Sequence, residues 1–152
     1  MDRKDYIRAK TDILWSKLYN YRRFNTEYLF LQDELAKLDE KVKDLQKPKG
    51  ISLSDDRVQN PKSQDTILLE IFTKQKQVEK EMLLAFGKMS EIRTIINLIE
   101  DDDIKGIAIK KFINDVSWDE LAHEYCCDRG TLVYKIKKEL SKFLHFSQCE
   151  KD

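Results

Sequence analysis

Two stretches of the sequence place an apolar side chain at every third or fourth position, and this pattern constrains the fold more than any other feature. On an α-helix such a heptad stripe lies along one face, and it must be buried against a partner because its own helix cannot cover it. The stripes consist of Leu14, Tyr21, Phe24, Tyr28, Leu31, Leu35, Leu38, Val42 and Leu45, and of Leu68, Ile71, Val78, Met82, Ala85, Met89, Ile92, Ile96 and Ile99. Leu18 fills a gap at Lys17, and Gln75 interrupts the second stripe. The simplest arrangement that buries both is an antiparallel, coiled-coil-like helical hairpin over residues 1–99.

The segment between the stripes interrupts the helical pattern. Pro48, Gly50 and Pro61 are helix breakers, and Ser63 can cap the helix that follows. The resulting loop, residues 47–63, exceeds the roughly 2 to 8 residues that usually join antiparallel helices. It is therefore either flexible or functional, and its polar composition also fits an ordinary solvated loop.

Additional apolar residues widen the second stripe beyond what one partner helix can cover. They are Leu84, Phe86, Ile95 and Leu98. We expect this wider surface to pack on the C-terminal region or on another subunit. Packing on another subunit would form a homodimer through the hairpin, which is the expected assembly. Pairing of the two stripes between chains, rather than within one chain, is the alternative.

Composition supports an all-α fold without naming a partner. The 152 residues include only four Gly and two Pro, and 37% are charged. Lys and Arg (28) balance Asp and Glu (28), so only local clusters of charge are informative. No stretch approaches the roughly 18 apolar residues of a membrane span, and the start MDRKDYIRAK lacks the apolar segment of a secretory signal. We therefore expect a cytoplasmic protein, and the three cysteines, two of them adjacent, suit a reducing compartment.

Residues 101–146 are predicted to form a second module of three helices. The acidic stretch EDDD, residues 100–103, favours the start of the first helix. Its predicted inner side consists of Ile104, Ile107, Ala108 and Phe112 or Ile113. After a turn at residues 114–116, Ser117 and Glu120 match an S-x-x-E capping box, so the second helix should begin at Trp118. Leu121, Ala122 and Tyr125 can face inward from it.

The last predicted helix is amphipathic and basic. Cys126–Asp128 interrupts the preceding helix, and Asp128 is a good N-cap for a helix that begins around Arg129. The expected inner face consists of Val133, Ile136, Leu140, Phe143 and Leu144, and the outer face of Thr131, Tyr134, Lys135, Lys138 and Lys142. Residues 129–143 carry five cations against one carboxylate, Glu139, a net charge of +4. Residues 147–152 are expected to form a tail.

A short joint before a basic, amphipathic last helix is typical of a helix-turn-helix, whose second helix lies in the DNA major groove. Arg129, Thr131 and Tyr134 are the best candidates for base contacts, whereas Lys135, Lys138 and Lys142 are suited to phosphate contacts. Gly130 lies in the same predicted DNA-binding segment. An ordinary solvated helix pair is the alternative, because exposed lysines are common on such helices.

The residues between the two stripes also resemble a known signature. Leu53, Ser54, Asp56, Arg57, Val58, Gln59, Ser63, Gln64 and Asp65 match the pattern LSxDRVQxxxSQD, which resembles that of an uncharacterised family of small proteins encoded by phages and prophages of Gram-positive bacteria. SWDELA (117–122) and VYKIKKEL (133–140) are similar to the helix-turn-helix of that family, to ArpU and RinA type regulators of late phage transcription, and to the fourth region of sigma factors.

The resemblance implies a transcription regulator that acts with host RNA polymerase at phage or prophage promoters. It does not imply a complete sigma factor, because heptad helices occupy the remaining N-terminal residues. Two positions depart from the family pattern. The joint from Cys126 to Arg129 has one extra residue, and Gly130 stands where a side chain able to contact DNA is expected. Either departure predicts weaker binding or dependence on a partner.

Other functional classes find less support in the sequence. His123, Cys126 and Cys127 suggest a metal site, but adjacent cysteines have poor geometry for one zinc ion. Consecutive aspartates such as Asp101 and Asp102 are better helix caps than magnesium ligands. No Gly-rich phosphate loop or nucleophilic triad is present, so we expect neither an enzyme nor a cofactor. The main alternative to a DNA-binding regulator is an oligomeric adaptor for phage assembly or packaging that does not bind DNA.

Overall fold

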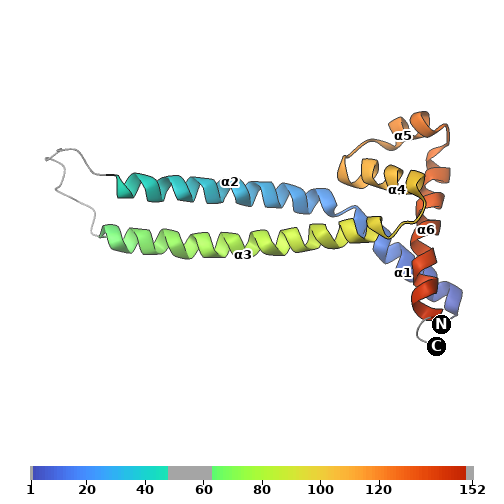
Figure 1. Cartoon of the computed structure of the whole chain (residues 1–152), viewed down its shortest axis with the longest axis horizontal. Helices are drawn as coiled ribbons and strands as arrows, with labels where there is room; N and C mark the ends of the chain where they lie inside the picture. Colours follow the sequence, from blue (N-terminus) through green and yellow to red (C-terminus); the bar gives the residue numbers. More distant parts are fainter. Residues whose placement is uncertain (1, 48–62, 150–152) are drawn as a thin grey trace. The chain divides into compact units, whose positions relative to one another are not determined.

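The computed structural model describes residues 2–47 and 63–149, with side chains up to Leu144. Apart from short turns this part of the chain is helical and contains no strand, which confirms the all-α class (Figure 1). The α-helices are α1 (Arg3–Leu18), α2 (Tyr21–Gln46), α3 (Gln64–Asn97), α4 (Asp102–Ala108), α5 (Trp118–Tyr125) and α6 (Arg129–Cys149). A π-helix, η2 (Ile109–Ile113), follows α4 directly.

The chain divides into two compact units. Residues 26–86, here called the hairpin unit, contain most of α2 and α3, which run antiparallel (Figure 1). Residues 1–25 and 87–152 form the helical unit. This division does not follow the predicted boundary at residue 99, because α1 packs against α6.

The hairpin unit confirms that the two stripes pair within one chain. Its core contains Leu31 and Leu38 from α2 and Ile71 and Val78 from α3, and five partly buried side chains pack around it: Leu35, Val42, Leu45, Ile67 and Met82. The polar interruption at Gln75 is accommodated because its side-chain amide donates a hydrogen bond of 2.6 Å to the Asp39 carboxylate of α2. Most of the predicted loop 47–63, and the signature residues before Ser63, lie outside the described residues.

The sequence pattern predicted one continuous helix for the first stripe from Leu14 onward, but the structure divides it between α1 and α2. The chain turns at Tyr19 and Asn20, between α1 and α2, and the Asn20 N–H donates to the Lys17 carbonyl at 3.0 Å. Leu18, which is fully buried, fills the gap at Lys17 as expected. The turn ends α1, which packs against α6 within the helical unit.

Four aromatic rings join α1 to the second half of the helical unit. Trp15 stacks on Trp118 with ring centroids 6.1 Å apart and an interplanar angle of 17°. Phe112, from η2, meets the rings of Trp15 and Tyr19 edge-on at 5.3 and 5.1 Å. The Trp118 indole N–H donates to the Tyr19 hydroxyl at 3.2 Å, so a hydrogen bond also links two of these rings.

The predicted helix caps are confirmed. The Ser63 hydroxyl accepts from the Thr66 N–H at 3.1 Å, and the Ser117 hydroxyl accepts from the Glu120 N–H at 3.2 Å. The Asp101 carboxylate accepts from the N–H groups of Asp103 and Ile104 at 2.9 and 3.1 Å. Each side chain satisfies donors that the first helical turn leaves unpaired, which fixes where its helix begins.

Two details of the C-terminal region were not predicted. η2 widens the helix before the turn, and the N–H groups of Asn114 and Val116 bond back to Ile109 and Lys110. At the other end, α6 continues to Cys149, so residues 147–149 are helical rather than part of a tail.

Candidate nucleic-acid interface

A three-residue joint, Cys126–Asp128, connects α5 to α6. Cys126 adopts the left-handed conformation (φ 53°, ψ 38°), and the N–H of Cys127 donates to the Ala122 carbonyl at 3.2 Å. This is the local geometry of a helix C-cap, for which glycine is usually preferred. A joint of three residues has the length found in helix-turn-helix motifs, although the resemblance suggested one residue too many.

Asp128 caps α6 as predicted. Its carboxylate accepts from the Thr131 N–H at 3.0 Å. The Thr131 hydroxyl also bonds to it, and these hydrogen bonds hold the pKa of the Asp128 carboxyl below its ordinary value. The cap therefore occupies the Thr131 hydroxyl, which was predicted to contact a base.

The inner face of α6 is rotated slightly from the predicted one. Leu132, Ile136 and Leu140 are fully buried, whereas Val133 is only half-buried. Leu132 was missed because the helical wheel was centred on Val133, its neighbour. Helical geometry places the two residues about 100° apart, so the central line of buried side chains begins with Leu132.

All seven predicted DNA-binding residues are exposed on α6. They are Arg129, Gly130, Thr131, Tyr134, Lys135, Lys138 and Lys142. Tyr134 is 65% exposed, which is high for a large aromatic side chain. The structure brings the last five together along one groove, whereas Arg129 lies with its guanidinium 5.9 Å from the Trp118 ring. An alanine methyl at Gly130 would meet no atom within 4 Å, so this position faces open space.

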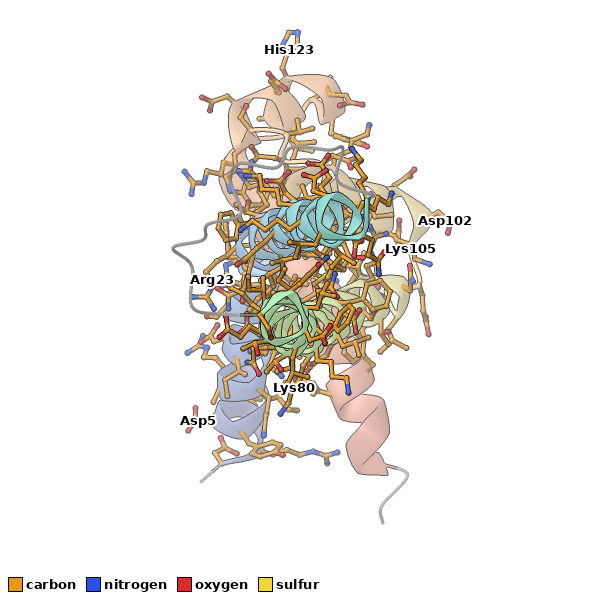
Figure 2. The ribbon with its side chains drawn as sticks, turned by 90° about the vertical axis from the view of Figure 1, so that its left-hand side faces the viewer. Asp5, Arg23, Lys80, Asp102, Lys105 and His123 are labelled. Carbon is orange, nitrogen blue, oxygen red and sulfur yellow. The ribbon has the colours of Figure 1, made fainter. Side chains whose placement is uncertain are left out.

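The groove has a volume of about 680 Å³ and one acidic edge. The α6 residues Tyr134, Lys135 and Lys138 line one wall, and Asp101 and Asp103 at the start of α4 line the opposite edge. The labelled Asp102 points away from the helices (Figure 2). Sequence reasoning missed this juxtaposition, because only the packing of α4 against α6 brings the acidic stretch beside the lysines.

The lysines on this surface differ in whether a carboxylate forms an ion pair with them. Lys142 forms a 2.7 Å ion pair with Glu139, whose side chain is only 6% exposed. This hydrogen bond, helped by the charges of Glu100 and Asp101, raises the pKa of the Lys142 ammonium. Lys138, by contrast, has no ion-pair partner among the residues that the structure describes. Lys138 is thus better placed than Lys142 to meet an external anion.

Lys110 and Lys111 add cations near this surface that the sequence did not assign to it. Lys110 contacts the Glu124 carboxylate and the Tyr125 hydroxyl, and these hydrogen bonds raise the pKa of its ammonium. Lys111 lies over the Trp118 ring at 5.0 Å. Both cations are held by the α5 side of the motif, where they stabilise its packing.

The residues considered for a metal site do not converge. His123 is exposed and points outward from α5 (Figure 2), Cys126 is exposed and Cys127 is half-buried. Within residues 2–47 and 63–149, no three His, Cys, Asp or Glu side chains gather as a metal site would require. No helix in that part of the chain is long and apolar enough to cross a membrane.

Comparisons with known proteins identify one family. The family model described as "Protein of unknown function (DUF1492)" matches residues 32–145, about three quarters of the 152 residues. Searches of curated proteins and of solved structures gave no significant match. The matched region includes most of the hairpin unit, all of α5 and most of α6. The chain therefore belongs to the DUF1492 family.

Proposed function

We propose that this protein is a DNA-binding transcription regulator, whose α5–α6 pair acts as a helix-turn-helix. The observation that carries the proposal is the exposed face of α6, which presents Tyr134, Lys135 and Lys138 after a three-residue joint. An exposed aromatic ring flanked by cations is suited to a surface of bases and phosphates. The firm caps at Ser117 and Asp128 hold both helices in place for such contacts.

The charges around the groove favour contact with DNA through the first turns of α6. Carboxylates at Asp101 and Asp103 would repel phosphates near Lys142, which is already paired with Glu139. Arg129 and Tyr134 lie on the first two turns, where a recognition helix usually meets base edges. We assign base contacts to these two residues, and phosphate contacts to Lys135 and Lys138.

The setting we propose is the transcription of phage or prophage genes in the bacterial cytoplasm. The LSxDRVQxxxSQD pattern and the likeness of residues 117–140 to ArpU, RinA and sigma region 4 support it. By this proposal the protein acts at promoters together with host RNA polymerase, and it does not replace a complete sigma factor.

The first experiment is to incubate the full-length protein with fragmented phage and host DNA, with and without RNA polymerase, and to sequence what is retained. We expect discrete promoter-proximal fragments that persist at physiological salt. Retention that requires polymerase would support the sigma-like role. Retention of bulk DNA that salt removes would contradict a sequence-reading regulator.

Charge variants test whether α6 makes the contact with DNA. Lys138→Glu should weaken DNA binding about tenfold or more and flatten its salt dependence, because a phosphate contact is lost. Asp103→Asn, on the opposite edge of the groove, should strengthen binding. Lys41→Glu on α2, exposed in the hairpin unit, is the matched control and should change little. Equal effects of Lys138→Glu and Lys41→Glu would rule out this placement of the helix.

An oligomeric adaptor remains the second candidate, because the hairpin unit exposes large apolar side chains that include Phe30, Leu69 and Leu83. It predicts stable assemblies of more than two subunits and no retained DNA at any salt concentration. Mass measurement of the same protein sample separates the two functions.

A further inference from the structure

Helix α3 carries a second stripe, separate from the side that packs in the hairpin. Its positions are Leu69, Phe72, Lys76, Glu79, Leu83 and Phe86, spaced three and four residues apart. The four apolar members are 66%, 43%, 72% and 54% exposed, respectively. At 100° per residue the stripe lies about 110° around α3 from the hairpin seam. The structure therefore leaves this heptad stripe of α3 largely exposed.

The order of residue types in this stripe is the same in both directions. From either end it reads apolar, apolar, charged, charged, apolar, apolar, and its centre lies between Gln77 and Val78. A two-fold axis at that centre would set Leu69 against Phe86 of a second copy, and Phe72 against its Leu83. The same axis would set Lys76 against Glu79 of the second copy, twice by symmetry.

We propose that this stripe is a homodimer interface in which the α3 helices of two copies pack antiparallel. Charge selects the direction, because a parallel pair would place Lys76 against Lys76 and Glu79 against Glu79. Both side chains are exposed and lack an ion-pair partner within the described part of the chain. The interface goes beyond the proposed function, since it does not depend on DNA binding.

A groove beside the stripe provides room for the second copy. Tyr28 and Leu35 of α2 and Leu83 and Phe86 of α3 line it, with Glu79 at its edge, and its volume is about 470 Å³. The Tyr28 and Phe86 rings contact each other at 6.2 Å. In the antiparallel register, Leu69 and Phe72 of the second copy lie opposite this end of the stripe. The groove thus receives the two apolar residues that the register brings to it.

The size of the contact indicates how strong the dimer should be. From Leu69 to Phe86 the stripe extends about 26 Å along α3. Each copy contributes four apolar side chains and one pair of charges, which is a small interface for a permanent dimer. We therefore expect a dimer that dissociates on dilution, rather than one required for folding.

Sedimentation equilibrium of the full-length protein over a hundredfold range of concentration tests this proposal. Leu83→Ser should weaken the dimer at least a hundredfold, because the side chain is lost twice at the interface. Leu84→Ser is the matched control: this neighbour is 60% exposed but lies off the stripe, and its dimer should match the wild type. Circular dichroism should show equal helicity in both variants, because neither position belongs to a core.

Charge substitutions test the register. Lys76→Glu and Glu79→Lys should each weaken the dimer about fivefold or more at low salt, because each replaces two attractions with two repulsions. An equimolar mixture of the two variants should recover the lost affinity, since all four facing charges then have opposite signs. A monomer at every concentration would overturn the dimer. Unchanged affinity in both charge variants, or an equal loss in Leu83→Ser and Leu84→Ser, would overturn the assigned surface.

Discussion

The hairpin unit and the helical unit bury their apolar residues in different ways. In the hairpin unit a single seam between α2 and α3 forms the core, and residues such as Leu38 and Val78 face only one partner helix. The helical unit surrounds Leu121, Leu132 and Ile136 with several helices, so each is fully buried. A single seam can be specified by local periodicity, whereas a core enclosed by several helices depends on contacts between distant segments.

The largest expected effect follows directly from this difference. Leu132→Ala should lower the free energy of unfolding by about 4 kcal/mol, and Leu38→Ala by about 2 kcal/mol, because the cavity at residue 132 is enclosed on more sides. Urea denaturation of both variants measures the two costs. A cost at Leu38 equal to that at Leu132 would mean that the hairpin core is as enclosed as that of the helical unit.

Replacing Trp15 tests whether α1 truly belongs to the helical unit. Trp15→Ala should cost about 2 to 3 kcal/mol, because it removes the stacking on Trp118 and the edge contact with Phe112. Hydrogen exchange in α1 should accelerate, while exchange at the α2 and α3 amides of the hairpin unit should not. Ile13→Ala, at an exposed position of the same helix, is the control. Uniform acceleration in both units would contradict the division.

Sequence reasoning predicted the hairpin more completely than the helical unit. The periodicity that ends at Leu45 and resumes at Leu68 identified the paired faces, and hydrogen-bonding side chains at Ser63 and Ser117 identified the helix starts. It could not show that α1 packs against α6, because Leu18 fills the gap at Lys17 and the heptad pattern continues through Tyr21. Tertiary packing decides that turn.

In the candidate site too, features of a single helix could be predicted from the sequence, whereas contacts between helices could not. Exposure of Tyr134, Lys135 and Lys138 followed from the helical wheel, since one face of α6 has to be buried. The acidic edge at Asp101 and the ion pair of Glu139 with Lys142 did not follow from it. Both require knowing which helix lies beside α6, and this information is not local in the sequence.

A smaller gain in stability is expected at the joint of the helical unit. Cys126→Gly should raise the free energy of unfolding by about 0.5 to 1 kcal/mol, because glycine adopts φ 53° without the steric cost of a Cβ atom. Thermal and urea denaturation measure the change. Cys127→Gly lacks this advantage and should destabilise, so a gain in both variants would point to cysteine chemistry instead.

The smallest effect concerns pH. Because the pKa of Asp128 is lowered in the folded protein, its stabilising contribution is present above the ordinary value of 3.8 and is lost as the pH falls through the lowered value. Asp128→Asn keeps a capping side chain but cannot titrate. The stability difference between wild type and variant should therefore shrink in acid. A difference that is constant with pH would show that the cap does not depend on charge.

The aromatic cluster has a spectroscopic consequence. Trp15 and Trp118 are the only tryptophans in the chain, and their stacked indoles both lie in the helical unit. Intrinsic tryptophan emission therefore reports the docking of α1 and is blind to the opening of the hairpin. Comparing it with far-ultraviolet circular dichroism, which the long helices dominate, would separate the melting of the two units without any added label.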